Sequence, residues 1–417
     1  MNIKTHNILG DINSDWHVYK FSEVAELIHG YQFRTNDFTK SGVKVFKITQ
    51  IKEDGTIDLS ACDFIESTRL EDFKKNVIQK GDILMALTGA TIGKIARYNS
   101  DETVLQNYRV GNFISKSENV LSKDFLFYFL KSKLFFNQLL ARQTQSAQQN
   151  IGKEDINNMS ICFPDIEKQK VIAEILCSID DKIENNLSTN KLLEDLLKAL
   201  FNEICVPKTD SDDFASFKLQ EFIDIKNGYA FKGMDFIDEG IPVIKIKNVK
   251  AGKVNLNNLS YVSIEIAEKA KRFRIKQNDL LITMSGNRID GTPETWVGKV
   301  GIFHRDGEYL LNQRVSILNI LDEEIMSRYF LSQLLSSEEF QYYFISNATS
   351  SGGQSNISPD LIYNTEIVVP PKEVMQKFHH LAKDIYSKIF ANELEIETLA
   401  NLRDTLLPKL MKGEINV

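Results

Sequence analysis

The chain has 417 residues, of which 42% are hydrophobic and 26% charged, and its formal net charge is −7. This length suffices for two or more domains with cores of their own, and the composition is that of an ordinary globular protein. No apolar run reaches the roughly 18 residues that a membrane span requires, and residues 1–17 contain no signal-peptide core, so we expect a cytoplasmic protein that does not contact a membrane. The acidic net charge argues against a uniformly basic nucleic-acid binder, but it does not exclude a local basic surface.

The predicted elements alternate between two kinds of segment. Short β-type runs broken by Gly, Asn and Asp fill residues 15–165 and again 216–370, with helical material over 122–143 and 323–345. A long run without Gly or Pro follows each stretch, at 167–205 and 372–407. We therefore predict an α+β fold with two similar α/β domains, at 1–165 and 207–371, and two long helices, at 166–206 and 372–413.

The two halves repeat each other. The run Gly30-Tyr31-Gln32-Phe33 returns as Gly228-Tyr229-Ala230-Phe231, and later landmarks recur in the same order with small insertions. A period of half the chain is too long for a solenoid, whose units run roughly 20 to 50 residues. We infer an internal duplication that presents two similar surfaces to a two-sided partner.

Both long helices carry the heptad pattern of a coiled coil. Seam positions advance by alternating steps of four and three, and an asparagine lies fifth in each seam, Asn186 in the first and Asn392 in the second. An ordinary pair of core helices is the alternative, but such helices seldom stay periodic over this length. We expect the helices to pair antiparallel, with Asn186 and Asn392 meeting near the centre to fix the register. The seam positions are Ile172, Leu176, Ile179, Ile183, Asn186, Asn190, Leu193, Leu197 and Leu200, and then Phe378, Ala382, Ile385, Ile389, Asn392, Ile396, Leu399, Arg403 and Leu406.

Basic clusters also occur in both halves. Lys74-Lys75 aligns with Lys271-Arg272, and Arg274 extends the second cluster. Repeated cations on an acidic chain favour phosphate contacts, which position a protein on DNA and make its binding sensitive to salt. The alternative is a solvated strand edge that lysines protect against aggregation.

Several other polar side chains could contact bases. The amides of Gln148, Asn150, Gln354 and Asn356 can read adenine edges, although a mobile polar loop is the alternative for these Ser/Gln-rich stretches. Arg109 and Arg314 could each read a guanine, yet their place within apolar strand-like runs favours a structural hydrogen-bonding role. The second half has extra residues over 287–297, which form either a base-contacting loop or a solvated insertion.

The order domain, long helix, domain, long helix resembles the DNA-specificity subunit of type I restriction-modification enzymes, over nearly the whole chain. Each short motif is weak evidence alone, but the set occurs in order and twice. The first repeat departs from the more typical Asn-Gln-Arg by having Asn107-Tyr108-Arg109, which leaves the role of position 108 open. The motifs are the doubled Gly-Tyr-x-Phe, Gly81-Asp82-Ile83-Leu84 and Asn278-Asp279-Leu280-Leu281, Thr88-Gly89 and Ser285-Gly286, Gly93-Lys94 and Gly298-Lys299, Asn107-Tyr108-Arg109-Val110 and Asn312-Gln313-Arg314-Val315, Gln148-Gln149-Asn150-Ile151 and Gln354-Ser355-Asn356-Ile357, and Pro164 with Gln169 and Pro370 with Gln376.

This resemblance implies that each domain is a target recognition domain reading one half of a bipartite site in double-stranded DNA. It implies that the helices set the spacing and dock the methyltransferase (modification) subunits, with two copies expected, and through them the restriction (motor and nuclease) subunits. Motif and loop residues join the basic and amide side chains as candidate DNA contacts: Thr88, Lys94, Ser285, Asn287, Arg288 and Lys299.

Catalytic motifs are missing from the sequence. It contains no phosphate-binding loop, no G-x-G-x-x-G after a strand and no Asn-Pro-Pro-aromatic signature of an adenine methyltransferase. We expect a non-catalytic chain that binds no cofactor, with S-adenosylmethionine, ATP and Mg²⁺ on the partner subunits that the resemblance implies. A fused methyltransferase-nuclease is the first alternative, but the two domains and two helices use the whole chain and leave no room for a catalytic domain. A coiled-coil adaptor with protein-binding heads is the remaining alternative.

Overall fold

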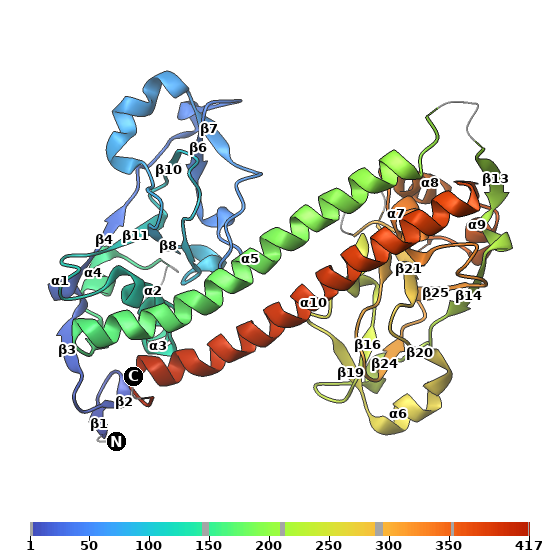
Figure 1. The fold of residues 1–417 in the computed structure, drawn as a ribbon. Helices are drawn as coiled ribbons and strands as arrows, with labels where there is room; N and C mark the ends of the chain where they lie inside the picture. The colour runs from blue at the N-terminus through green and yellow to red at the C-terminus, as the bar shows by residue number, and fades with distance from the viewer. Residues whose placement is uncertain (1–2, 144–149, 209–212, 288–294, 352–353, 416) are drawn as a thin grey trace. The chain divides into compact units, whose positions relative to one another are not determined.

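The computed structural model describes residues 3–143, 150–208, 213–287, 295–351, 354–415 and 417. It divides into two compact units, residues 1–185 with 395–417 and residues 186–394. Each unit contains one globular head and parts of the long helices α5 (Ile166–Ile204) and α10 (Lys372–Met411) (Figure 1). We call residues 3–165 head 1 and residues 213–371 head 2. Within the described ranges, no helix combines the length and the apolar character that crossing a membrane requires.

Head 1 is built on two four-stranded sheets. One has the antiparallel order β4-β11-β8-β9, and the other has the order β10-β6-β7-β5, in which β10 runs parallel to β6. The elements of head 1 are β1 (Ile3–His6), β2 (Gly10–Asn13), β3 (His17–Lys20), α1 (Phe21–Val24), β4 (Ala25–His29), β5 (Phe38–Thr39), β6 (Val43–Phe46), β7 (Asp63–Ile65), β8 (Ile83–Ala86), β9 (Ile95–Arg97), β10 (Val104–Gln106), β11 (Val110–Ser115), α2 (Lys123–Lys131), α3 (Lys133–Gln143), α4 (Lys153–Asn157) and β12 (Ser160–Phe163).

Head 2 repeats this topology. Its sheets have the orders β14-β25-β21-β23-β18-β17 and β15-β19-β16-β24-β20, and β24 again runs parallel to β16. The elements of head 2 are β13 (Ala215–Lys218), β14 (Ile223–Asn227), β15 (Phe236–Ile237), β16 (Ile241–Ile244), β17 (Val249–Lys250), β18 (Gly252–Val254), β19 (Ser260–Val262), α6 (Ile264–Lys269), β20 (Arg274–Ile275), β21 (Leu280–Thr283), β22 (Ser285–Gly286), β23 (Val300–Ile302), β24 (Tyr309–Leu311), β25 (Val315–Ile320), α7 (Arg328–Leu335), α8 (Glu338–Asn347), β26 (Thr349–Ser351), β27 (Gln354–Asn356), α9 (Pro359–Tyr363) and β28 (Glu366–Val369).

The matching strand orders confirm the duplication read from the sequence. Strands β4, β11, β8 and β9 of head 1 correspond to β14, β25, β21 and β23 of head 2, and β10, β6, β7 and β5 correspond to β24, β16, β19 and β15. Head 2 adds β17, β18 and β20 at its sheet edges. The expected pair of similar α/β domains is therefore present.

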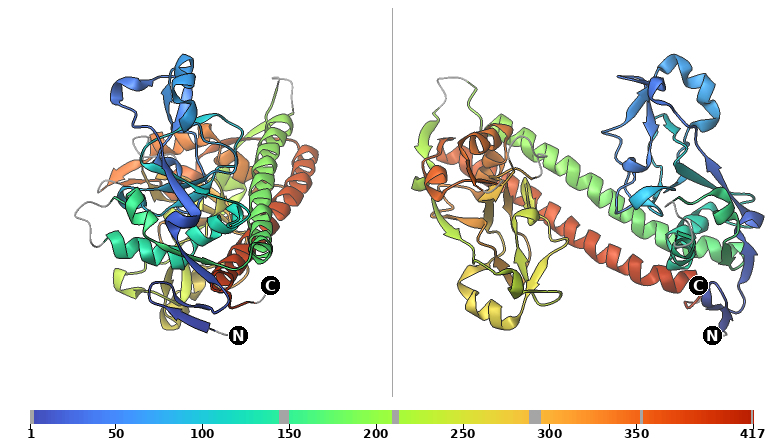
Figure 2. Two further views of the ribbon diagram at one scale, coloured as in Figure 1. Left: turned by 90° about the vertical axis from the view of Figure 1, so that its left-hand side faces the viewer. Right: turned by 180° about the vertical axis from the view of Figure 1, so that it is seen from behind.

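Each head has a helical end and a sheet end. In head 1 the strands β6, β7 and β10 lie at the end opposite α2 and α3, and in head 2 β16, β19 and α6 lie opposite α7 and α8 (Figures 1 and 2). The helical end of head 1 shares one apolar core with Ile172 and Leu176 of α5 and with Leu410 of α10. Head 2 does the same with Phe201 of α5 and Phe378 of α10, so burial of apolar surface fixes each head to the helix segments of its own unit.

The heptad seam is confirmed. Every expected seam position on α5 and α10 is buried or half-buried, while most residues between them are exposed. In unit 1, Lys182 pairs with Glu395 at 3.4 Å and Asp180 with Arg403 at 2.8 Å. In unit 2, Asn190 contacts Asn392 and Phe201 contacts Phe378. As numbers rise along one helix they fall along the other, so the helices run antiparallel within each unit.

The asparagine contact differs from the expected one by one helical turn. Asn392 Nδ2 donates to Asn190 Oδ1 at 2.7 Å, and Asn190 Nδ2 donates to the carbonyl of Ile389 at 3.4 Å. Asn186, the expected partner, lies one seam position earlier on α5 and is also buried. The sequence places both asparagines on the seam, but the heptad pattern alone does not say which rungs face each other.

The Asn190–Asn392 pair should contribute to stability only while both amides are present. Replacing Asn392 with leucine alone should lower the free energy of unfolding by about 1–3 kcal/mol, because a buried amide loses its partner. Replacing both Asn190 and Asn392 with leucine should recover that loss, since two apolar side chains then pack in the seam. Urea unfolding of the full chain measures both effects. The exposed Asn401 of α10, changed to leucine, is the matched control, and a double variant as unstable as the single one would contradict the pairing.

Candidate nucleic-acid interface

The motif Asn107-Tyr108-Arg109-Val110 forms a β-turn between β10 and β11. The Val110 N–H donates to the carbonyl of Asn107 at 2.9 Å, and the side-chain oxygen of Asn107 accepts the N–H of Arg109 at 3.2 Å. An asparagine at the first position of a turn makes this bond to its own backbone. Asn107 is buried, so the turn places Tyr108 and Arg109 at its tip, where Arg109 is exposed.

Head 2 contains the same turn between β24 and β25. Val315 N–H donates to the carbonyl of Asn312 at 2.9 Å, and the Asn312 side-chain oxygen accepts the N–H of Arg314 at 3.3 Å. Asn312 is buried, while Gln313 and Arg314 at the tip are both exposed. The asparagine of this motif is thus a structural residue, and the two residues after it are presented to solvent.

The Gly-Tyr-x-Phe motif supports one side of each turn. Tyr31 N–H donates to the carbonyl of Gln106 at 2.9 Å, and Tyr108 N–H donates back to Tyr31 at 2.9 Å. This approach leaves no room for a side chain at Gly30, because an added Cβ would lie 2.2 Å from the Gln106 carbonyl oxygen. In head 2 the Cβ added at Gly228 would lie 2.2 Å from the Asn312 carbonyl oxygen. Each glycine therefore permits a close backbone approach.

The segment that follows β8 or β21 and leads into Thr88-Gly89 or Ser285-Gly286 supports the other side. Leu87 N–H donates to the carbonyl of Arg109 at 3.0 Å, and Met284 N–H donates to the carbonyl of Arg314 at 2.8 Å. The Gln-x-Asn-Ile motif contacts the same segment. The Ile151 N–H donates to the carbonyl of Leu87 at 3.0 Å, and the Ile357 N–H donates to the carbonyl of Met284 at 3.0 Å. Four motifs far apart in the sequence thus meet in each head.

Aromatic clusters connect the turns to the basic clusters. The ring of Tyr31 lies 4.8 Å from that of Phe73, which directly precedes Lys74-Lys75. The ring of Tyr229 lies 5.4 Å from that of Phe273, which directly follows Lys271-Arg272. All four basic residues are exposed, and Tyr31 is 44% exposed. Each head therefore carries cations close to its arginine turn.

The exposed cations are weakly engaged within the chain. Lys74 lies 3.4 Å from Glu71 and Lys271 lies 3.9 Å from Glu268, and such pairs on the surface contribute little. Arg274 is engaged more closely. Its Nε donates to Glu308 at 2.7 Å and it lies 3.0 Å from Glu268, and the hydrogen bond to Glu308 raises the pKa of its guanidinium. Two carboxylates already balance that charge, so a phosphate gains less from Arg274.

The Gly-Lys motif has a packing role that the sequence did not reveal. Gly93 and Gly298 adopt φ values of 83° and 80° and approach the rings and methyls of α3 and α8. Lys94 lies 2.5 Å from Glu53, and its side chain is 19% exposed. Lys299 is 7% exposed, with its Nζ 5.6 Å from the centre of the Trp296 ring. Lys94 is thus half-buried and Lys299 buried, and both remain candidate DNA contacts.

The hydroxyl and amide candidates meet in pairs. Thr88 forms a β-bridge with the exposed Asn150, and Ser285 Oγ donates to Asn356 Oδ1 at 2.6 Å. Ser285 is 5% exposed, so its hydroxyl stabilises the strand pair β22–β27 instead of facing solvent, whereas Gln354 and Asn356 remain half-buried. Asn287 is exposed and donates to Thr295 Oγ1 at 3.1 Å. Gln148 and Arg288 lie outside the described residues.

The two turn arginines combine hydrogen-bonded backbone with exposed side chains. The structural hydrogen-bonding role that apolar flanking runs favour for Arg109 and Arg314 is present in their backbone, because each N–H donates to the asparagine two residues earlier. The Arg109 side chain also donates to Tyr108, and both arginines are exposed. The available signal was the asparagine two residues earlier, which favours a turn over a continuous strand.

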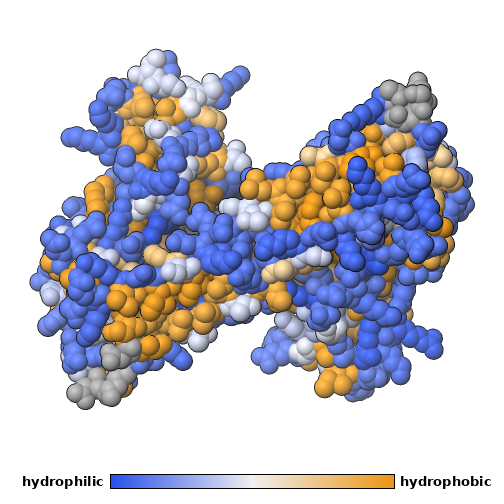
Figure 3. Space-filling view, viewed as in Figure 1, coloured by the Kyte–Doolittle hydropathy of each residue, from blue (hydrophilic) through white to orange (hydrophobic). Residues whose placement is uncertain are grey.

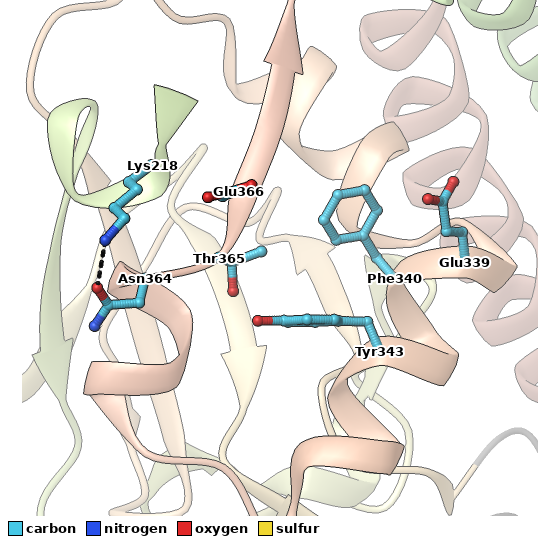
Figure 4. A pocket seen from close by; sticks show the side chains of 7 residues that line it. All are labelled: Lys218, Glu339, Phe340, Tyr343, Asn364, Thr365 and Glu366. Atoms are coloured by element: carbon cyan, nitrogen blue, oxygen red, sulfur yellow. Dashed lines mark hydrogen bonds between the residues drawn. The ribbon is translucent and has the colours of Figure 1, made fainter. Parts of the chain in front are cut away.

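A surface pocket of about 380 Å³ in head 2 lies outside this interface (Figure 4). Its lining includes Glu339 and Glu366, and Lys218 Nζ donates to Asn364 Oδ1 at 3.1 Å. Figure 4 shows the hydroxyl end of Tyr343 directed toward Asn364 and Thr365. The two carboxylates would repel a phosphate, so we exclude this pocket from the candidate interface.

Comparison with known proteins gives the class. The model of the type I restriction modification DNA specificity domain matches residues 13–194 and 211–399. These matches cover far more than half of the chain, one in each half. The chain therefore belongs to this family, as the duplicated motifs indicated.

Individual relatives match over nearly the full length. The chain is 26% identical to the type I restriction enzyme MjaIX specificity subunit of Methanocaldococcus jannaschii, over 98% of this chain and 95% of that protein. It is 20% identical to the EcoKI specificity subunit of Escherichia coli, over 97% and 90%. The crystal structure of the type I restriction-modification S subunit from M. genitalium superposes with a TM-score of 0.61 at 17% identity, covering 98% and 97% of the two chains, and so has the same fold.

The close backbone approach at Gly228 should make this position intolerant of a side chain. Gly228→Ala should lower the free energy of unfolding by about 1–3 kcal/mol, because the methyl group must displace backbone. Gly233→Ala, five residues on and with open space around an added Cβ, is the matched control and should have little effect. Thermal unfolding measures the loss, and hydrogen exchange at the Gln313 amide, which bonds Tyr229 at 2.9 Å, localises it. Equal effects of the two substitutions would contradict the assigned constraint.

Proposed function

We propose that this chain is the specificity subunit of a type I restriction-modification enzyme. It binds double-stranded DNA, and each head reads one half of a bipartite target. The observation that carries the proposal is the doubled arginine turn with a basic cluster beside it, in a chain that belongs to a DNA specificity family. Two heads in one chain can read two different half-sites, whereas a symmetric dimer reads a palindrome. Family membership does not favour the adaptor alternative.

The long helices act as the spacer between the recognition domains, for which we propose the bounds 1–165 and 207–371. The helices then occupy 166–206 and 372–413. The continuous seam and the buried Asn190–Asn392 pair support this role, because a polar pair at a seam penalises slipped registers. A fixed register fixes the separation of half-sites that the chain accepts.

The same helices dock two methyltransferase subunits. Figure 3 shows apolar surface over the C-terminal half of α5 and over the C-terminal half of α10. Leu196 of α5 is 48% exposed, and Leu402, its duplicate on α10, is 45% exposed. Leu192 adds a further 69%-exposed side chain beside Leu196. Exposed leucines at equivalent positions suit two copies of one partner.

Catalysis belongs to the partners in this proposal. The methyltransferase subunits bind S-adenosylmethionine, and the restriction subunits that join through them use ATP and Mg²⁺. The complex acts in the cytoplasm. The specificity chain supplies positioning and sequence selection, and it holds no cofactor of its own.

Exchange of one head tests the function directly. Replacing residues 1–165 with the first head of another family member should change one half of the methylated sequence and leave the other half and the spacer unchanged. Methylome sequencing of cells that express the chimera with its methyltransferase measures this. If both halves changed together, the two heads would not read independently.

The purified chain alone should transfer no methyl group, and methyl transfer by it would contradict a non-catalytic role.

The docking surfaces can be tested separately. Leu196→Glu and Leu402→Glu should each remove one methyltransferase copy, weakening its binding at least tenfold, because a buried leucine contributes about 1.5–3 kcal/mol. Native mass spectrometry counts the copies. Leu321→Glu in head 2, at a leucine that is 60% exposed, is the matched control and should leave two copies bound. Two bound copies in both helix variants would exclude this surface.

A further inference from the structure

The arginine at each turn tip differs from the arginines that carboxylates engage elsewhere in the same head. Arg69 lies 3.1 Å from Asp37, Arg97 lies 2.9 Å from Asp124, and Arg274 lies between two glutamates. Neither Arg109 nor Arg314 forms an ion pair with any residue that the structure describes. Both are exposed, and both lie on backbone held by hydrogen bonds from either side.

Arg109 is also oriented by its neighbour. Its Nε donates to the Tyr108 hydroxyl at 2.8 Å, and its guanidinium carbon lies 5.3 Å from the centre of the Tyr108 ring. These contacts leave the two terminal nitrogens without a partner in the described part of head 1. A guanidinium held at Nε presents its terminal N–H groups as a fork, and this fork matches the O6 and N7 acceptors of guanine in the major groove.

Arg314 occupies the same position in head 2 without such a tether. Gln313 replaces the tyrosine, and the only hydrogen bonds described for Arg314 are those of its backbone. The turn geometry is nevertheless the same in both heads. The guanidinium in head 2 thus starts from an equally fixed Cα, with more side-chain freedom to lose on binding.

Rigid support distinguishes a base reader from a phosphate contact. A side chain that reads a base edge must be positioned closely, and sites on anchored backbone achieve this best. A phosphate contact needs only a charge near the DNA backbone, which Lys74, Lys75, Lys271 and Arg272 supply from 3-10 helical segments.

We propose that Arg109 and Arg314 are base-reading residues, each forming a bidentate contact with one guanine in the half-site of its own head. Tyr108 is a positioning residue for Arg109. This inference rests on the proposed function and assigns to named residues the recognition that the function requires.

Selection from random-sequence duplexes tests the inference. The full chain in complex with its methyltransferase subunits first defines the preferred bipartite sequence, and Arg109→Lys and Arg314→Lys are then selected in the same way. Lysine keeps the charge but loses the planar fork. We expect Arg109→Lys to reduce discrimination about 5- to 150-fold at one G·C pair in one half-site, and Arg314→Lys to do so in the other half-site.

Phosphate-contact variants provide the comparison. Lys74→Ala and Arg272→Ala should weaken binding on all sequences alike and lower the slope of log K against log salt by about one each. Tyr108→Phe keeps the ring but removes the hydroxyl, so it should lower discrimination at the same G·C pair less than Arg109→Lys does. All substituted side chains are exposed or partly exposed, and unchanged thermal unfolding confirms that the heads remain folded.

The outcomes separate the inference from the function. Uniform weakening by both arginine variants would make them phosphate contacts and overturn the inference, while the bipartite preference of the wild type would leave the function intact. Lost discrimination at an A·T pair, or unchanged discrimination, would overturn it equally. A wild-type complex that selects no bipartite sequence would overturn the function, and the inference with it.

Discussion

The close backbone approach between the Gly-Tyr segment and the Asn-x-Arg turn is the contact on which each head depends. In head 1 the chain leaves one sheet at β10 and enters the other at β11, and the turn between them is where Gly30 meets the Gln106 carbonyl. A side chain at that glycine would push apart two segments that reciprocal hydrogen bonds hold together. The same contact at Gly228 links the sheets of head 2. The position of each exposed arginine follows from it.

The cations of the heads fall into two groups: those that are buried or paired within the chain, and those that are exposed to a partner. Lys299 is buried, and two carboxylates balance the charge of Arg274 at the surface of head 2. Lys74, Lys75 and Arg272 stay exposed, and Arg109 and Arg314 stay on anchored turns. An acidic chain can therefore bind an anionic polymer, because local field and geometry matter more than net charge at the contact.

The sequence predicts what depends on local periodicity and fails where tertiary contacts decide. The seam on α5 and α10 follows from spacing alone, and the duplication follows from motif order. The partner of Asn392 does not follow, since Asn186 and Asn190 both satisfy the heptad pattern and only helix packing selects Asn190. The burial of Lys299 does not follow from the sequence, because it depends on tertiary packing beside the Trp296 ring. The exposure of Arg109 does not follow either, because β-type residues surround a turn that one asparagine specifies.

Duplication followed by divergence is consistent with how these contacts are made. The hydrogen bonds that fix each turn come from the main chain or from its asparagine, so the tip residue is free to differ, and head 1 has Tyr108 where head 2 has Gln313. The head–helix contacts show the same drift. Tyr128 of head 1 donates to Asp180 of α5 at 2.9 Å, whereas on α10 the residue equivalent to Asp180 is Tyr386, whose hydroxyl accepts from Gln333 of head 2 at 2.9 Å. Geometry is kept while side-chain chemistry changes, and this is the condition under which two heads of one fold come to read two different sequences.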